Sequence, residues 1–209
     1  LKCWRLWSTF IDADHKDGID YVTINDDAYV RVSDTSHAVH LNNGTNDFGA
    51  GTKVALPAIV LDGPGEFVTA TDINGDGWED LIVGNTLKAD ASIGREFGTQ
   101  HVYQILINDA DGTGSFTDQT ATRLTDQDWT SSYESFVYMK DFNNDGVLDM
   151  AFKVGNAQIS VFRTYLNVDG VFTRFDHGIT ETMGTFVIDD FNNDGKLDIL
   201  GTLAATPSL

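Results

Sequence analysis

The chain has 209 residues, of which 32 are acidic and 13 are basic, so its formal net charge is −19 at pH 7. A surface this acidic repels phosphate backbones, which argues against nucleic acid as a partner. The 41% hydrophobic content is sufficient for a globular core. No apolar run approaches the roughly 20 residues that span a membrane.

A nine-residue acidic pattern occurs four times and is the most informative feature of the chain. Three copies carry Asp, Asn, Asp and Asp at positions 1, 3, 5 and 9, with Gly at position 6. Oxygen-bearing side chains two residues apart around a tight glycine turn suit a hard cation such as Ca²⁺. Three copies in register predict both a repeat protein and a metal site. The four copies, named loops 1 to 4 below, are residues 12–20, 72–80, 141–149 and 190–198.

Loop 1 departs from the pattern. It begins with Asp12, has Asp14 at position 3 and ends with Asp20, but position 5 is Lys16 and the glycine has moved to position 7. One alternative is that Asp17 replaces the missing ligand. The other is that the Lys16 ammonium fills the site with its own charge. Metal binding by loop 1 therefore stays open, and of the four copies we expect this one to depart from the metal-binding rule.

Short runs of β-branched and aromatic residues flank the loops, which predicts that each loop joins two strands of a hairpin. Alternating segments at 101–108 and 160–167 each precede a glycine-containing turn, at 111–114 and 169–170, and then an aromatic residue. The predicted strands are 66–71, 81–84, 101–108, 135–140, 150–154, 160–167, 185–188 and 199–200.

The predicted order in each unit is strand, metal loop, strand, strand, turn and outer strand, which is the anatomy of a β-propeller blade. We therefore predict an all-β fold of four-stranded antiparallel blades, in one partial propeller domain over 1–209 with about three and a half blades. Residues 86–100 and 119–133 are expected to be longer loops, and no amphipathic helix is expected. Because an open arc exposes strand edges, we expect further blades of a longer chain, or another subunit, to complete the ring.

The end of the pattern separates it from other calcium loops. An EF-hand needs Glu at position 12 and flanking helices, whereas position 12 here is Val83, Phe152 or Gly201 and the flanks are strands. The Gly-Gly-x-Gly-x-Asp pattern of calcium-binding β-helix repeats is absent. We expect Asp at position 9 to close the site and position 7 to coordinate through its backbone carbonyl. The position 7 residues are Trp78, Val147 and Lys196.

Asp-x-Asn-x-Asp-Gly-x-x-Asp between two strands resembles the FG-GAP/VCBS repeats of integrin-α-like β-propellers. Phe48-Gly49-Ala50-Gly51, ahead of loop 2, is a loose match to the Phe-Gly element of that family. The segment from Ile107 to Gly112 resembles its Asn-Asp-Gly turn before an outer strand. The resemblance covers most of the chain at repeat level. It implies a seven-bladed ring with calcium sites on one rim, in an adhesion receptor, lectin, secreted surface protein or accessory domain of a polysaccharide-cleaving enzyme.

By this resemblance, positions 1, 3, 5 and 9 of loops 2 to 4 supply calcium ligands, and position 7 adds its carbonyl. We expect three calcium sites, with a fourth in loop 1 left open. Three aspartates per loop should repel one another without metal, so the fold is expected to depend on Ca²⁺. The predicted ligands are Asp72, Asn74, Asp76, Trp78 and Asp80 in loop 2; Asp141, Asn143, Asp145, Val147 and Asp149 in loop 3; Asp190, Asn192, Asp194, Lys196 and Asp198 in loop 4; and Asp12, Asp14 and Asp20 in loop 1.

Catalysis is not expected within this chain. The clustered aspartates are accounted for as metal ligands rather than as a carboxylate pair for glycoside hydrolysis. The five histidines fall in no catalytic spacing, and no phosphate-binding glycine loop occurs. Trp78, Trp129 and Tyr133 are candidates to stack on a sugar ring. The alternative, which we favour, is that these aromatic residues pack between neighbouring blades.

The sequence therefore favours a non-catalytic calcium-binding propeller segment, extracellular or at the cell surface, that recognises a carbohydrate or an extracellular protein. Extracellular modules bind Ca²⁺ with dissociation constants of roughly 10⁻⁴–10⁻³ M, which suits this location. Two alternatives stay open. One is an accessory scaffold of a secreted polysaccharide-degrading enzyme with catalytic residues elsewhere. The other is a structural repeat of a surface filament or matrix.

Overall fold

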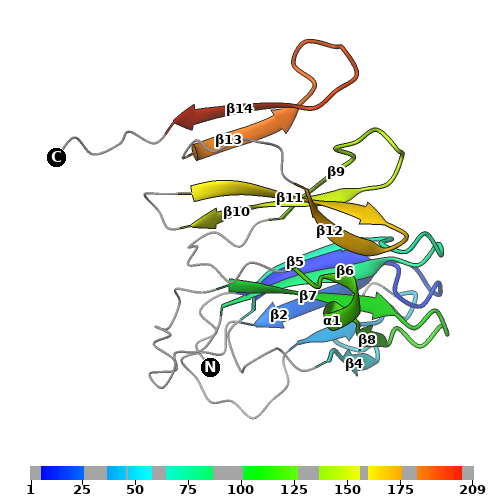
Figure 1. Cartoon of the computed structure of the whole chain (residues 1–209). Coiled ribbons are helices and arrows are strands. Elements are labelled where there is room, and N and C mark those ends of the chain that lie inside the picture. Colours follow the sequence, from blue (N-terminus) through cyan, green and yellow to red (C-terminus); the bar gives the residue numbers. More distant parts are fainter. Residues whose placement is uncertain are drawn as a thin grey trace.

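The structure, a computed structural model, describes residues 6–25, 37–45, 47–57, 65–86, 101–126, 137–155, 160–175 and 183–203. These residues form three four-stranded antiparallel sheets and one two-stranded sheet. The predicted all-β fold with blade-like units of four antiparallel strands is confirmed. The described residues form an open stack of sheets rather than a closed ring (Figure 1).

Strands that follow one another in the chain are neighbours in each sheet, so each sheet is a meander. Their order matches the predicted strand, loop, strand, strand, turn and outer strand. The first sheet contains β1 (Leu6–Ile11), β2 (Asp20–Asn25), β3 (Ala38–His40) and β4 (Lys53–Ala55); the second β5 (Gly65–Thr71), β6 (Asp80–Thr86), β7 (His101–Asn108) and β8 (Phe116–Asp118); the third β9 (Val137–Lys140), β10 (Asp149–Gly155), β11 (Ser160–Val168) and β12 (Val171–Phe175); and the fourth β13 (Met183–Asp189) and β14 (Asp198–Leu203).

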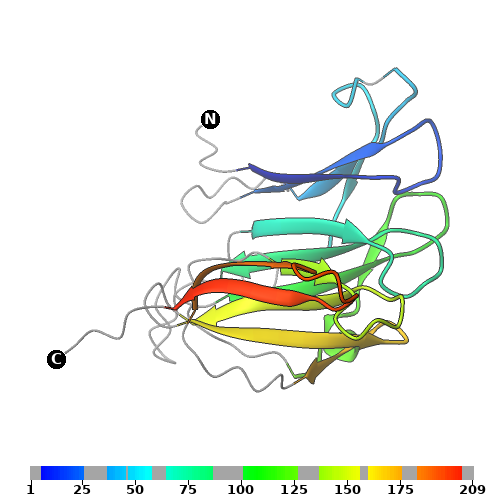
Figure 2. The ribbon, with the colours of Figure 1, turned by 90° about the horizontal axis from the view of Figure 1, so that it is seen from above.

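Each nonapeptide loop connects the first two strands of its sheet. The position 9 aspartate pairs with the residue just before position 1, as in the pairs Ile11–Asp20 and Thr71–Asp80. Figure 1 shows the four loops on the same side of the stack, and Figure 2, turned by 90°, shows them together again. We call this side the loop edge.

The inner sheets bury both of their faces. Along β6, Leu81 and Val83 pack in the apolar layer against the first sheet, while Ile82 packs in the layer against the third. Along β10, Phe152 faces the second sheet and Ala151 the fourth. Strands buried on both faces are nearly continuous apolar runs in sequence, which explains why the central segments alternate so weakly between apolar and polar residues.

The prediction of an uninterrupted loop over 119–133 is wrong at its start. One helical turn, α1 (Thr120–Arg123), follows β8. The Asp118 carboxylate stabilises it by accepting hydrogen bonds from the backbone N–H and the hydroxyl of Thr120, at 2.9 and 2.6 Å. Residues 127–133 of that expected loop, and 87–100 of the other, lie outside the described residues. Among the described residues, no helix is long and apolar enough to cross a membrane.

The layer between the second and third sheets gives a test of the stack. Phe152 is 2% exposed, and its ring lies 4.5 Å from Tyr103 and 5.2 Å from Tyr165, centroid to centroid. Replacing it by alanine leaves a cavity, so Phe152→Ala should lower the free energy of unfolding by about 3–5 kcal/mol in urea titrations. The control Val168→Ala, at a side chain that is 55% exposed, should change it by less than about 0.5 kcal/mol. Equal effects of the two substitutions would contradict this packing.

Candidate metal centres

The aspartate at position 9 is fully buried in loops 1, 2 and 3. In loop 2, Oδ2 of Asp80 accepts a hydrogen bond from the backbone N–H of Ile73 (2.9 Å), and Oδ1 accepts one from Asn108 (2.8 Å). This carboxylate therefore ties the start of its loop to the end of the third strand. The same pairs of bonds join Asp20 to Ala13 and Asn42 in loop 1, and Asp149 to Phe142 and Asn167 in loop 3.

An asparagine that the sequence analysis did not single out completes this arrangement. Its side-chain amide crosses to the preceding loop: Asn108 Nδ2 donates to the carbonyl oxygen of Ala13 (3.0 Å), and Asn167 Nδ2 to that of Ile73 (2.9 Å). The second and third sheets are thus each linked to the loop of the sheet before them. The available signal was an asparagine at or just beyond the end of every third strand, at Asn42, Asn108 and Asn167.

Positions 1, 3 and 5 of loops 2 to 4 come together through one recurrent network. In loop 2, Asp72 Oδ2 accepts from the backbone N–H of Gly77 (2.9 Å), and Asp76 Oδ1 accepts from that of Trp78 (2.9 Å). The Asn74 amide lies 2.9 Å from Asp76 Oδ2. Carboxylate oxygens that accept one hydrogen bond keep a further lone pair for a cation. In the matching bonds of loops 3 and 4 the aspartates accept and the asparagine amides donate; the residues are Asp141, Asn143, Asp145, Asp190, Asn192 and Asp194.

Loop 1 keeps the positive φ of the regular loops at positions 4 and 6 although its glycine has moved to position 7. Positions 4 and 6 have positive φ in loop 2, at Gly75 (77°) and Gly77 (89°). In loop 1 the same two positions are His15 (54°) and Asp17 (52°). Asp17 therefore takes the left-handed conformation that glycine takes elsewhere, at a steric cost that Asp tolerates better than most residues.

The structure gives Lys16 a partner outside loop 1. The Lys16 ammonium donates a hydrogen bond to the carbonyl oxygen of Gly112, in the β7–β8 turn of the second sheet. It does not fill the site, and the close carboxylate group of loop 1 does not include Asp17. That group consists of Asp12, Asp14 and Asp20.

This group of loop 1 fits a divalent cation. One carboxylate oxygen from each of Asp12, Asp14 and Asp20 lies within 4.8 Å of the others. Ca²⁺–oxygen distances of 2.3–2.6 Å put ligand atoms on opposite sides of one ion about 5 Å apart, so these oxygens can share a coordination sphere. Asp12 Oδ1 is buried without a hydrogen-bond partner, and Asp14 is only 7% exposed. A buried, unpartnered carboxylate oxygen is costly unless a cation compensates it.

Among the described residues, this is the one group of three acidic, histidine or cysteine side chains that lie so close. In loops 2 to 4 the three aspartates do not form so close a group, and those at position 5 (Asp76, Asp145 and Asp194) are exposed. Calcium binding by these loops, including coordination through the carbonyls of Trp78, Val147 and Lys196, stays a prediction.

The position 9 carboxylates are held at an energetic cost. Burial raises the pKa of Asp80 from 3.8 to about 6, although the N–H donors of Asn108 and Ile73 lower it, and the nearby Asp76 and Asp72 carboxylates raise it further. Burial likewise raises the pKa of Asp20 and Asp149. A bound cation would offset this cost, since positive charge favours the ionised form.

Trp78 packs between neighbouring units, as the favoured alternative predicts. Its indole stacks on the imidazole of His15 in loop 1, with ring centroids 3.7 Å apart and planes at 8°. One face of the indole is thus covered. The two other aromatic candidates, Trp129 and Tyr133, lie outside the described residues.

Comparison with known families agrees with this geometry. Residues 64–94, which include β5, loop 2 and β6, match the family model described as FG-GAP repeat. The protein therefore contains an FG-GAP repeat, which confirms the resemblance drawn from the sequence. Its other three loops lie in the same strand–loop–strand setting. A search of the curated proteins found no match.

The raised pKa of Asp80 gives a pH test. Without metal, the folded state takes up a proton at about pH 6 and the unfolded state only near 3.8. The Asp80 contribution should therefore make the chelated protein more stable as pH falls from 7 towards 4. With Ca²⁺ bound, the ion keeps this carboxylate ionised in the folded state, so neither state takes up a proton between pH 7 and 5 and the contribution should disappear.

Thermal melts of the wild type and Asp80→Asn between pH 7 and 5, in chelator and in calcium, isolate this contribution. Asp126→Asn, at an exposed carboxylate outside the loops, is the control. A difference between wild type and Asp80→Asn that has the same pH trend in both media would contradict a cation at Asp80.

Proposed function

We propose that this protein is a calcium-binding, non-catalytic recognition module of the cell exterior, built on propeller-like FG-GAP repeats. The observation that carries the proposal is the carboxylate group Asp12–Asp14–Asp20, which is compact and largely buried and contains a buried oxygen without a partner. A group of this kind suits a hard divalent cation, and oxygen-only ligands of this number and spacing favour Ca²⁺.

Loops 2 to 4 bind further calcium ions in this proposal. Their Asp, Asn, Asp and Asp side chains are already held in one hydrogen-bonded network on the loop edge, so an ion has little side-chain entropy to overcome. Their exposure implies weak binding, and dissociation constants of roughly 10⁻⁴–10⁻³ M match extracellular rather than intracellular calcium levels. This supports a location outside the cell.

The partner is expected at the loop edge. Apolar side chains there are exposed beside the acidic loops: Ile19 is 51% exposed, Val147 40% and Leu148 42%. Apolar groups next to carboxylates and bound cations suit an extracellular protein or an acidic carbohydrate, whose anionic groups can complete the coordination of an exposed calcium ion. Because His15 covers one face of Trp78, sugar stacking on that residue is limited to the other face.

Calcium titration tests the proposal. At about 10 mM, Ca²⁺ exceeds a dissociation constant of about 10⁻⁴ M a hundredfold and stabilises the folded state by about 2.7 kcal/mol per site. The melting temperature in calcium should exceed that in chelator by roughly 5–10 °C per occupied site. Titration calorimetry should show saturable heat.

Loop 3 offers a matched pair of variants. Asp145→Ala removes a predicted ligand and should reduce the calcium-dependent part of the shift, whereas Asp169→Asn, an exposed carboxylate in the β11–β12 turn, should leave it unchanged. Identical melts in calcium and chelator, with no heat of binding, would rule out a calcium module.

A further inference from the structure

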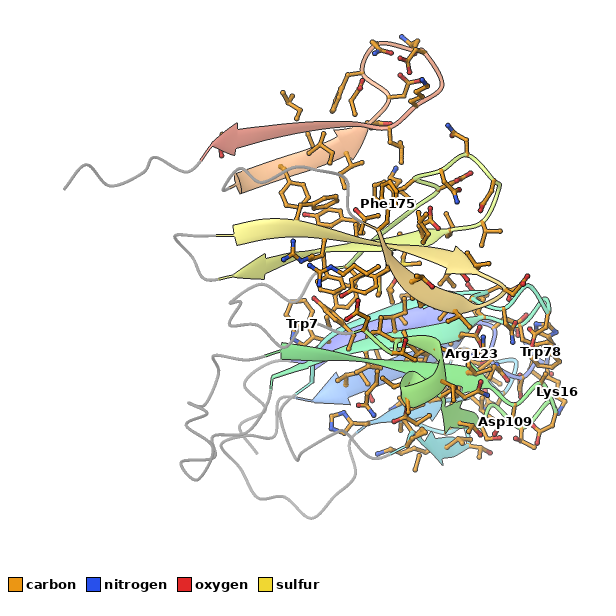
Figure 3. The ribbon with its side chains drawn as sticks, viewed as in Figure 1. Trp7, Lys16, Trp78, Asp109, Arg123 and Phe175 are labelled. Carbon is orange, nitrogen blue, oxygen red and sulfur yellow. The ribbon has the colours of Figure 1, made fainter. Side chains whose placement is uncertain are left out.

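Four residues of loop 1 contact the second sheet. The backbone N–H of Asp12 donates to Glu79 Oε2 (3.2 Å), and the carbonyl of Ala13 accepts from Asn108 Nδ2 (3.0 Å). The imidazole of His15 stacks on the Trp78 indole, and the Lys16 ammonium donates to the Gly112 carbonyl. Figure 3 labels Trp78, Lys16 and, in the β7–β8 turn, Asp109, all at the loop edge.

Only one of these contacts follows from the common repeat. The asparagine bond recurs one unit later, from Asn167 to Ile73. The others depend on residues that differ between loops. Positions 7 and 8 are Trp78-Glu79 in loop 2 but Val147-Leu148 in loop 3, and positions 4 and 5 of loop 1 are His15-Lys16 where the regular loops have Gly-Asp or Asn-Asp. The residues in which loops 1 and 2 differ from the other loops therefore contact each other.

Lys16 also has a counterpart at the next interface. There Arg123, from α1, donates to the Gly170 carbonyl in the β11–β12 turn (2.7 Å). A cation thus binds the glycine turn of the following sheet at both interfaces. At the first interface this cation comes from the metal loop itself, at the cost of the position 5 aspartate. Loop 1 compensates with Asp14 at position 3, where the other loops have asparagine, so that positions 1, 3, 5 and 9 of each loop still supply three carboxylates.

These contacts fix the backbone that carries the carboxylates. Glu79 holds the N–H of Asp12, whose Oδ1 is the buried oxygen without a partner. The Asn108 amide holds the carbonyl of Ala13, and the Asn108 backbone N–H binds Asp80 of loop 2. The close group Asp12–Asp14–Asp20 therefore exists in a loop whose first peptide groups are positioned by another sheet.

We propose that the cation site of loop 1 is assembled across the interface between the first and second sheets, with Trp78 and Glu79 as positioning residues that touch the loop and not the ion. This rests on the proposed function, since the occupant is a divalent cation such as Ca²⁺. By linkage, an ion in loop 1 stabilises the packing of the two sheets by the same factor by which that packing raises the affinity for the ion.

The experiment is a calcium titration of the full chain followed by amide NMR, which resolves the loops. The Ala13 and Asn42 amides bind Asp20 and report on loop 1, and the Phe142 and Asn167 amides bind Asp149 and report on loop 3. The variant Trp78→Val with Glu79→Leu gives loop 2 the position 7 and 8 residues of loop 3. It should weaken calcium binding to loop 1 by about tenfold and leave loop 3 within about twofold, as expected for a coupling of 1–3 kcal/mol.

Two further variants separate positioning from general destabilisation. Trp78→Phe with Glu79→Gln keeps an aromatic ring and an acceptor oxygen, so it should restore most of the affinity of loop 1. Lys196→Val changes position 7 of loop 4, whose side chain is exposed, and should leave loop 1 unchanged. If the variant Trp78→Val with Glu79→Leu does not fold, two other measurements test the proposal. They are calcium binding by the variant Trp78→Phe with Glu79→Gln and the effect of calcium on hydrogen exchange at the Asp12 amide.

The outcomes are distinguishable. Unchanged loop 1 affinity in the valine and leucine variant overturns the inference while calcium binding stands. So does a wild type in which loops 3 and 4 bind Ca²⁺ and loop 1 does not. If no loop binds Ca²⁺, the proposed function itself fails. A parallel loss of affinity in loops 1 and 3 would show that the two residues act only on overall stability, which also overturns the inference.

Discussion

The structure depends on one buried carboxylate in each of the first three repeats. At the end of each loop an aspartate begins the second strand, and in loops 1 to 3 its two oxygens accept the backbone N–H at position 2 and the N–H of an asparagine on the third strand or just beyond it. One side chain thus sets the curvature of the loop, the register of the hairpin and the position of the third strand. Burial makes this charge expensive, as the raised pKa of Asp80 shows, and a cation bound in the loop would lower that cost.

The same asparagine joins neighbouring sheets of the stack. Its backbone N–H binds the position 9 aspartate of its own sheet. Its side-chain amide binds a carbonyl of the preceding loop, so the loop edge is continuous from one sheet to the next. Behind this edge an apolar layer lies between each pair of neighbouring sheets. The fourth sheet shows the importance of such a neighbour: Leu200, two residues after its loop as Ile82 is in the second sheet, is 62% exposed, whereas Ile82 is fully buried.

The nonapeptide pattern and the short apolar runs were enough to predict the hairpins, the strand order and the family, because each depends on residues close together in sequence. The side-chain bond of this asparagine was missed because its acceptor lies about 90 or more residues away, as in Asn108 with Ala13 and Asn167 with Ile73. The fate of Lys16 was missed for the same reason, since its partner is Gly112. Position 9 was predicted only as a metal ligand, whereas its oxygens also bind two backbone amides. The helical turn after β8 was missed because four residues give no periodicity.

Native-state hydrogen exchange at the amides of Ile73 and Asn108 tests the central claim most directly, because both donate to Asp80. In the wild type they should exchange as slowly as the amides of the β6–β7 ladder. In Asp80→Asn one of them should face a side-chain NH₂ group in place of an acceptor, and its protection should fall by about 1–3 kcal/mol. Unchanged protection at both amides would contradict the view that this carboxylate holds each repeat together.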